Sequence, residues 1–346
     1  MKAEQAVVKI TQYVMQQLVS GTPHDDIKKT IVDQLKFCDA RTLYSIIKAI
    51  EFVVSNVHKG VPYQVVRAHL MQRDFSMEWI AALMGEALIY ARTPYGACPL
   101  CESKDVHYME KMANPVVPPA MRWMRCSACD HVFTDGYHSP ELQDLFFKFD
   151  GTSVRYTINQ EFIQFMEKVR PMSGRRVERV MQYVDRGTWL DVGFGAGSLL
   201  LTAQEYGYTP VGIDLNPNLL RRIQGFDVEA YCTTLEAFDR PAGSFSVISM
   251  TDVIEHLPYP QTCLTAVGRL LERGGALFVV TPNRGSAVWR MNEMNGFNAY
   301  YGTQDHYHAF SREGLYALLS RHGLKPVSFA VSERFRMGME VIAIKE

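Results

Sequence analysis

The sequence predicts an α/β protein whose C-terminal half contains a mostly parallel β-sheet, preceded by an α-helical bundle and a small cysteine-rich module. Three observations predict this fold class. Short β-rich runs alternate with helical stretches after residue 186, apolar positions recur at helical spacing before residue 95, and four cysteines fall into two close pairs between these segments. Such alternation of strands and helices is typical of parallel sheets covered by crossover helices.

Composition and charge argue against a nucleic-acid-binding protein and against a membrane protein. The chain has 346 residues, 47% of them hydrophobic, which is enough for two or three globular domains. Its formal net charge of −1 argues against a protein that binds mainly by neutralising phosphates, so nucleic acid is an unlikely partner. The sequence contains neither an apolar run long enough to span a membrane nor a secretory signal pattern, and we expect a cytoplasmic protein without membrane attachment.

Residues 1–95 are expected to form a bundle of four or five helices. Val7, Ile10, Val14 and Leu18 make one apolar stripe at helical spacing, and further stripes follow. We interpret this bundle as an oligomerisation or lid module, through which the chain would form a homo-oligomer. Residues 139–186 are helical again and are expected to be a connector that also covers part of the next domain.

Residues 96–138 contain the paired cysteines, Cys98 with Cys101 and Cys126 with Cys129. Two Cys-x-x-Cys pairs separated by 24 residues predict a zinc-ribbon-like module, because four thiolates complete the tetrahedral coordination of a structural Zn²⁺ ion. Such a closed site stabilises the fold and leaves no position for a substrate. A pair of redox motifs and four unrelated cysteines are the alternatives.

The segment from residue 187 to residue 346 should hold the parallel sheet. Its β-rich runs are Thr188–Val192, Pro210–Asp214, Val228–Tyr231, Ser246–Met250, Ala276–Thr281, Val327–Val331 and Met339–Ile344.

A glycine-rich turn follows the first of these runs, and an acid ends the second. Gly193, Gly195 and Gly197 precede a helix, where bare backbone and free N–H groups accept a polar ligand. Asp214 lies about twenty residues later, where a carboxylate can bind both ribose hydroxyls. The glycine spacing is G-x-G-x-G rather than the dinucleotide G-x-G-x-x-G, because Ser198 follows Gly197. Together these features predict a nucleoside-binding half-fold.

At these motifs the chain resembles the class I S-adenosylmethionine-dependent methyltransferases, in the subgroup that includes the ubiquinone-type O-methyltransferases and many natural-product enzymes. The resemblance covers residues 155–346 and extends to Asp252-Val253-Ile254-Glu255-His256, Gly274-Gly275 and Phe310-Ser311. It implies a Rossmann-like seven-stranded sheet with an antiparallel last strand, S-adenosylmethionine as the cofactor and a small-molecule acceptor.

The resemblance also implies residue roles. Asp191, Gly193, Gly195 and Gly197 would hold the methionine end of the cofactor and Asp214 its ribose. The adenine would lie beside Leu215, Thr234 and Leu235, and Thr251 with Asp252 would lie where cofactor and acceptor meet. Thr233-Thr234 stands where the family often has Gly-Asp, so adenine recognition would rely on backbone groups.

Methyl transfer to oxygen, with carbon as the second choice, needs a base for the acceptor proton. Three histidines are candidates: His306, favoured because it matches a recurrent family histidine, His256 and His308. In an extended segment His306 and His308 would point in opposite directions. A structural role for His256 is equally compatible with the sequence, and the aromatic residues Trp289, Phe297, Tyr300 and Tyr301 fit either a lid or loop packing.

Three other function classes remain as alternatives. A nicotinamide-dependent oxidoreductase would use a similar nucleotide half-site, an RNA-modifying methyltransferase could use the zinc module as its reader, and a non-catalytic partner could keep the fold as a scaffold.

Overall fold

The computed structural model describes residues 92–109, 122–138, 158, 160–296, 298–302, 305–334 and 337–346, together with Tyr13, Phe52 and Leu70. The predicted helical bundle lies outside the described residues, apart from these three positions and the segment from residue 92. The first part of the predicted connector, up to residue 157, also lies outside them.

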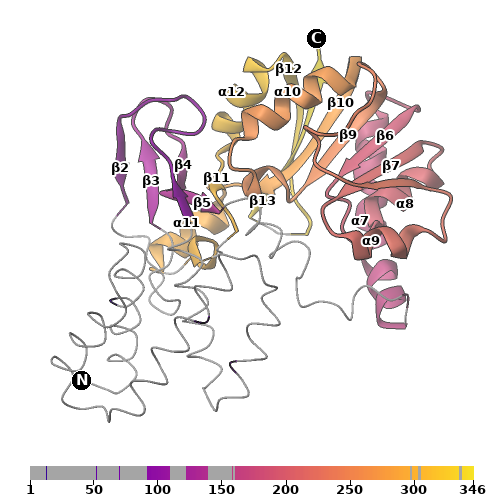
Figure 1. The fold of residues 1–346 in the computed structure, drawn as a ribbon, viewed down its shortest axis with the longest axis horizontal. Helices are drawn as coiled ribbons and strands as arrows, with labels where there is room; N and C mark the ends of the chain where they lie inside the picture. Colours follow the sequence, from indigo (N-terminus) through magenta and orange to yellow (C-terminus); the bar gives the residue numbers. More distant parts are fainter. Residues whose placement is uncertain are drawn as a thin grey trace.

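A seven-stranded sheet forms the centre of the C-terminal domain (Figure 1). In chain order the strands are β6 (Thr188–Val192), β7 (Thr209–Asp214), β8 (Glu229–Cys232), β9 (Phe245–Thr251), β10 (Leu271–Pro282), β12 (Leu324–Val331) and β13 (Gly338–Lys345). They are arranged β12-β13-β10-β9-β6-β7-β8, and β13 is antiparallel to both neighbours while the other pairs are parallel. All seven predicted β-rich runs form strands, and the implied antiparallel last strand is confirmed.

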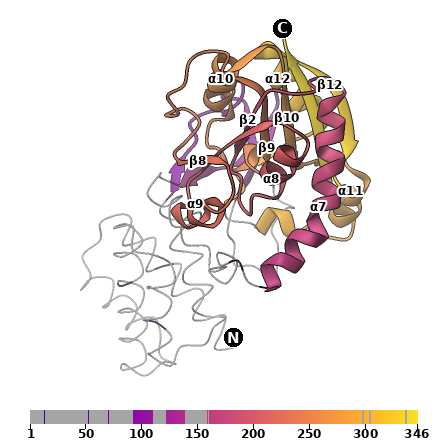
Figure 2. The same cartoon turned by 90° about the vertical axis from the view of Figure 1, so that its right-hand side faces the viewer.

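Helices cover both faces of this sheet (Figures 1 and 2). They are α7 (Gln160–Met181), α8 (Ser198–Glu205), α9 (Pro217–Ile223), α10 (Pro260–Leu270) and α12 (Arg312–Arg321). Helix α11 (Ala287–Met294) lies beside the cysteine module instead, and the 3-10 turns are η3 (Ile254–His256) and η4 (Ala299–Gly302). Helix α7 falls within the predicted connector, but its residues Val177 and Val180 are buried in one cluster with Trp189 of β6. It is therefore an integral helix of the domain, because its apolar face packs on the central strand.

The cysteine module is a small antiparallel structure beside the α/β domain (Figure 1). Its strands are β1 (Arg92–Pro94), β2 (Val106–Tyr108), β3 (Trp123–Cys126), β4 (Val132–Thr134) and β5 (Gly136–His138). A strand from the C-terminal domain, β11 (His308–Ala309), pairs with β4 and completes the order β11-β4-β3-β2. The two units thus share a sheet, which the sequence pattern does not indicate.

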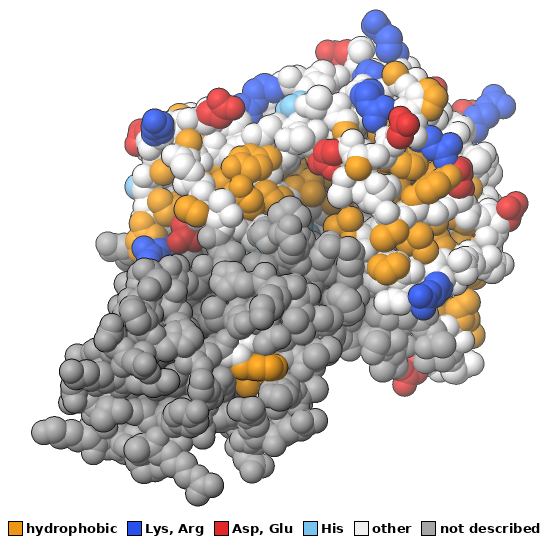
Figure 3. All heavy atoms as spheres, viewed as in Figure 1, with side chains coloured by type: hydrophobic (Ala, Val, Ile, Leu, Met, Phe, Trp, Pro, Cys, Tyr) orange, Lys and Arg blue, Asp and Glu red, His pale blue; other side chains and the backbone are white. Residues whose placement is uncertain are grey.

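The visible surface of the described domains is mixed in charge. Figure 3 shows Lys and Arg side chains interspersed with Asp and Glu, in keeping with the balanced composition. Within the described residues, none of the helices combines the length and the apolar character that a membrane span requires.

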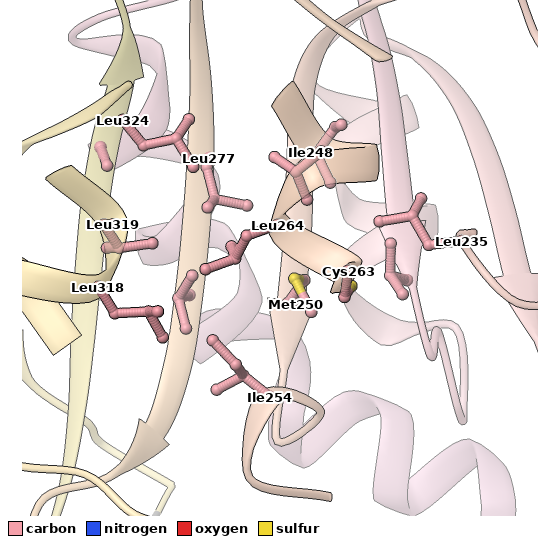
Figure 4. Close-up of a cluster of buried hydrophobic side chains, with 14 of the residues drawn as sticks. Leu235, Ile248, Met250, Ile254, Cys263, Leu264, Leu277, Leu318, Leu319 and Leu324 are labelled. Carbon is pink, nitrogen blue, oxygen red and sulfur yellow. The ribbon is translucent and has the colours of Figure 1, made fainter. Parts of the chain in front are cut away.

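The main core lies between the sheet and helices α10 and α12. Successive residues of a strand point to opposite faces, so Leu190 joins this cluster whereas Trp189 joins the one beneath α7 and α8. Figure 4 shows Leu264 of α10 among Leu277, Leu318 and neighbouring apolar side chains. Burial of this kind supplies most of the stability that fixes the ends of the strands, where the site lies.

Truncation of Leu264, which is fully buried, is expected to destabilise the domain. We expect Leu264→Ala to lower the free energy of unfolding by about 2–5 kcal/mol, because it removes transfer free energy and leaves a cavity. Val331→Ala, at a side chain that is 62% exposed on β12, should change it by less than about 0.5 kcal/mol. Urea denaturation followed by circular dichroism measures both, and equal stability of the two variants would contradict the packing described here.

Candidate functional site

The glycine-rich turn between β6 and α8 has a backbone that other residues rarely adopt. Gly193, Gly195 and Gly197 have φ values of 66°, 54° and 78°. A Cβ atom on Gly193 would lie 2.8 Å from the Cγ2 atom of Val253. The strand–turn–helix predicted from the sequence therefore forms, and its backbone is exposed where Gly193 and Gly195 line a cavity.

Asp214 ends β7 and faces this turn. Its Oδ2 atom accepts a hydrogen bond from the Gly195 backbone N–H at 3.0 Å, and its Oδ1 atom accepts one from the Asn216 N–H at 2.9 Å. Burial raises the pKa of the Asp214 carboxyl group above its usual value. Each carboxylate oxygen can accept more than one hydrogen bond, so these contacts orient the group without exhausting it.

Two cavities meet at Asp214. The larger has a volume of about 680 Å³ and the smaller about 310 Å³, and both are lined by Gly193, Asp214 and His256. The larger is within the usual size of a ligand pocket. Together they form one crevice along the carboxyl ends of β6, β7 and β9, the usual place for ligands of an open α/β sheet.

Most residues predicted to bind cofactor line this crevice. Asp191, Gly193, Gly195, Asp214 and Thr251 line the larger cavity. Leu215, Thr234, Leu235 and Asp252 line the smaller one. Gly197 is buried as the N-cap residue of α8 and lies beneath the turn, outside the described lining of both cavities.

Two polar side chains in the larger cavity, those of Thr251 and Asp191, could bind a polar ligand. The buried hydroxyl oxygen of Thr251 lacks a hydrogen-bond partner among the described residues, a costly state unless a ligand or water supplies one. Asp191 is 3% exposed, accepts a hydrogen bond from the Ser249 hydroxyl at 2.6 Å, and has a pKa raised to about 7, chiefly by burial. A cationic group beside Asp191 would favour its charged form.

Helix α7 lies in the segment expected to cover part of the domain, and it contributes residues to the larger cavity that the sequence did not identify. Phe162, Ser173 and Arg176 line it from this helix, and Arg222 lines it from α9. The available signal was the apolar face of α7, which indicates packing against the domain. That signal carries no information about which residues border a cavity.

The three candidate histidines occupy different environments. His256 lies at the junction of the cavities, and its Nδ1–H donates to the Asp305 carbonyl oxygen at 2.9 Å. His306 packs behind it, with its ring centre 4.6 Å from that of His256 and 4.5 Å from that of Tyr300. Burial lowers the pKa of His306 to about 3. The structure thus brings His256 and His306 together, with His256 in the lining of both cavities and His306 outside the described lining of either.

His308 lies on the opposite side of its segment, against the cysteine module. Its Nε2–H donates to the Leu257 carbonyl oxygen at 2.8 Å, and its Nδ1 atom lies 2.9 Å from Nε2 of His131. His308 is fully buried and outside the described lining of both cavities. This geometry suits a structural link between the two units better than contact with a ligand.

Glu255 was not singled out from the sequence, yet it joins the two histidines. It is 1% exposed, and its Oε2 atom accepts a hydrogen bond from the Thr281 hydroxyl at 3.0 Å. Burial raises its pKa to about 7. One ligand atom from each of Glu255, His256 and His306 lies within 4.8 Å of the other two. The adjacency of Glu255 to His256 in sequence was the only local signal.

The four paired cysteines converge at the end of the small sheet. Their sulfur atoms all lie within 4.8 Å of one another, with 3.7 Å between Cys98 and Cys129 and 3.5 Å between Cys101 and Cys126. Zn–S bonds of about 2.3 Å in a tetrahedron place sulfur atoms roughly 3.8 Å apart. Glu102 and Asp130, each directly after a pair, both have a left-handed φ near 60°. The two pairs thus form matching turns that fit a tetrahedral metal ion.

The aromatic tract packs against the cysteine module. Trp289, Tyr300 and Tyr301 are buried in a cluster with Trp123 of β3, whose indole N–H donates to the Tyr301 carbonyl oxygen at 3.0 Å. Phe297 lies outside the described residues. Of the two interpretations that the sequence left open, loop packing describes these three residues.

Comparison with known proteins identifies the domain. A family model described as a methyltransferase domain matches residues 161–328. A ubiquinone biosynthesis O-methyltransferase of Nitrosococcus oceani is 27% identical over 204 residues, covering 54% of this chain and 81% of that protein. One from Pectobacterium atrosepticum is 32% identical over 109 residues, covering 30% of this chain and 45% of that protein.

Other relatives and one solved structure are more partial matches. A ubiquinone biosynthesis O-methyltransferase of Erwinia tasmaniensis is 27% identical over 155 residues, covering 42% of this chain and 62% of that protein. The 1,6-didemethyltoxoflavin-N1-methyltransferase of Burkholderia thailandensis has a TM-score of 0.41 and 17% identity, covering 62% of this chain and 95% of that one.

The family match supports an enzymatic methyltransferase over the oxidoreductase and scaffold alternatives, since it covers the residues that form the crevice. Its residues 161–328 begin at α7, which agrees with the packing of that helix on the sheet. With the glycine turn and Asp214 at the ends of neighbouring parallel strands, residues 161–328 form a methyltransferase domain of the class I S-adenosylmethionine-dependent type.

Proposed function

We propose that this enzyme transfers a methyl group to a hydroxyl oxygen of a small-molecule acceptor, with histidine-assisted loss of the hydroxyl proton. The observation that carries the proposal is the position of His256, which borders the cofactor crevice and contacts His306. The names of the relatives, which are O-methyltransferases of ubiquinone biosynthesis, support oxygen as the accepting atom.

S-adenosylmethionine would lie along the crevice, with its adenine in the smaller cavity and its methionine end in the larger. The Asp214 carboxylate would hold the ribose hydroxyls, and the smaller cavity, with apolar Leu215 and Leu235, would take the adenine. Gly193 and Gly195 would lie under the methionine end, with Asp191 beside its ammonium group. The unpartnered hydroxyl oxygen of Thr251 supports a ligand at this point.

The bound cofactor supplies a methyl group on a sulfonium: the acceptor oxygen forms the new C–O bond, and the electron pair of the broken C–S bond stays on sulfur. The protein orients the acceptor, excludes water and assists loss of the hydroxyl proton. Residues of α7 and His256 line the same larger cavity, so both reactants would lie between them.

The cysteine module would have a structural role. Four thiolates fill the coordination of Zn²⁺, which leaves no position for the acceptor. The module positions the segment that carries His306. Strand β11 of this segment pairs with β4, and the Tyr307 carbonyl oxygen accepts a hydrogen bond from the Thr134 N–H at 2.9 Å. It would therefore stabilise the position of the segment next to the acceptor site.

Removal of the Asp214 carboxylate should weaken cofactor binding. We expect Asp214→Ala to reduce the affinity for S-adenosylmethionine and for S-adenosylhomocysteine by at least about tenfold, because hydrogen bonds to a charged group are lost. Titration calorimetry measures this effect. Asp227→Ala, at an exposed carboxylate, is the matched control and should bind as wild type does. Equal binding by Asp214→Ala would refute the ribose assignment.

The affinity for S-adenosylmethionine should depend on pH through Asp191. The pKa of this residue is raised to about 7, so it is mostly neutral below pH 7, whereas the cofactor ammonium favours the charged form. We expect affinity to rise between pH 5.5 and 7, with a slope approaching tenfold per pH unit at the acid end, and then to level off. Calorimetry with Asp191→Asn provides the comparison, and the same slope in that variant would assign the effect elsewhere.

His306→Ala should slow turnover while leaving cofactor affinity nearly unchanged. We expect a loss of up to about 10²-fold in kcat, because His306 packs against His256 and its removal would misplace the ring that borders the crevice. Release of S-adenosylhomocysteine with a panel of phenolic acceptors measures the rate. His322→Ala, at a half-buried position that caps α12, is the control and should retain the wild-type rate. An unchanged rate for His306→Ala would remove His306 from the mechanism.

A further inference from the structure

We propose that the cysteine module holds one wall of the adenine cavity in place, so that metal binding at the four cysteines and cofactor binding in the crevice strengthen each other. The inference rests on the proposed function, since it takes the smaller cavity as the site of the adenine. It gives the module a part in setting cofactor affinity, in addition to its part in the fold.

A short segment between η3 and α10 forms this wall of the smaller cavity. Leu257 and Pro258 line the cavity, together with Cys263 of α10. Residues 257–259, which we call the wall segment, are outside any helix or strand. Pro258 and Pro260 have no backbone N–H to donate. The position of the wall segment therefore depends strongly on hydrogen bonds that its carbonyl oxygens accept.

Two successive carbonyl oxygens of the wall segment accept hydrogen bonds from side chains at the cysteine module. The hydroxyl of Tyr95, which follows β1, donates to the Pro258 carbonyl oxygen at 2.7 Å. The Leu257 carbonyl oxygen accepts from Nε2–H of His308 at 2.8 Å, and His308 lies in the strand that pairs with β4. The module thus fixes two neighbouring peptide groups of the cavity wall.

The first cysteine pair is held against the same region. Gln261, near the start of α10, donates from Nε2 to the Pro99 carbonyl oxygen at 2.5 Å. Arg321 of α12 donates from Nη1 to the Leu100 carbonyl oxygen at 3.3 Å. Pro99 and Leu100 are the two residues inside the first Cys-x-x-Cys pair. A change in this turn on loss of the metal would therefore reach the helix that begins directly after the wall segment.

The second cysteine pair is connected to the wall segment through two histidines. The Cys126 N–H donates to the His131 carbonyl oxygen at 2.9 Å, and Nε2 of His131 lies 2.9 Å from Nδ1 of His308. Burial lowers the pKa of His308 to about 4, so its ring is neutral near pH 7 and carries one N–H, which donates to Leu257. His131 is then the donor to His308, and a continuous series of contacts leads from a cysteine to the cavity wall.

Apolar packing joins the metal site and the cavity in one core. Cys98 and Cys126 are buried in the same cluster as Leu235 and Cys263, and the latter two line the smaller cavity. Close-packed side chains cannot shift independently, so a displacement at one site is felt at the other. Two ligands that favour the same arrangement of a shared core bind with a coupling free energy, which is equal in both directions.

Reciprocal binding measurements on the full-length protein test this coupling. Titration calorimetry with S-adenosylhomocysteine compares zinc-loaded protein with protein stripped of metal by a chelator. Chelator competition measures the Zn²⁺ affinity with and without saturating S-adenosylhomocysteine. We expect zinc to raise the affinity for S-adenosylhomocysteine about fivefold or more, and S-adenosylhomocysteine to raise the zinc affinity by the same factor. No zinc binding by wild type, or cofactor affinity independent of zinc, would overturn the inference.

Tyr95→Phe tests the connection without removing a metal ligand. It keeps the ring but loses the hydrogen bond to Pro258, and should lower the affinity of zinc-loaded protein for S-adenosylhomocysteine and for adenosine by about 3–10-fold each. The factor by which zinc and S-adenosylhomocysteine favour each other should fall in similar proportion, which a hydroxyl that only stabilised the fold would not cause. Tyr108→Phe, at an exposed position of β2 in the same module, is the matched control and should keep the wild-type values.

Unchanged cofactor affinity or an unchanged coupling factor in Tyr95→Phe would disprove the connection. Weaker binding of S-adenosylhomocysteine with full affinity for adenosine would also disprove it, because the effect would then lie outside the adenine cavity. The methyltransferase function stands in each of these cases if zinc-loaded wild type binds S-adenosylhomocysteine. Failure of that binding would instead refute the proposed function.

Discussion

The hydrogen bond from the Gly195 N–H to the Asp214 carboxylate is the contact on which the site depends. It joins the turn after β6 to the end of β7, and so fixes the bare backbone and the carboxylate in one crevice. The turn can form only because Gly193, Gly195 and Gly197 accept positive φ values. The parallel register of β6 and β7, held by the core on both faces of the sheet, keeps the two ends side by side.

The second half of the crevice depends on contacts between the two structural units. Strand β11 belongs to the sheet of the cysteine module, while the residues before it reach the end of β9. His308 bridges the units by its contacts with His131 and Leu257, and Trp123 is buried in the aromatic cluster. A metal bound by the cysteines would thus stabilise the segment that carries His306, although it lies outside the crevice.

The three candidate histidines have different environments because of this arrangement. His308 contacts the cysteine module at its interface with the α/β domain, whereas His256 and His306 lie close to Glu255.

Local patterns in the sequence determined the strands, the glycine turn, Asp214 and the paired cysteines, because each depends on residues close together in the chain. The tertiary structure alone decided that α7 walls the crevice, that β11 completes the sheet of the cysteine module, and that Glu255 joins His306. These features are contacts between segments that lie far apart in the sequence. The packing of side chains on both faces of the sheet determines which distant segments come together. The periodicity and residue spacing of a single segment do not contain this information.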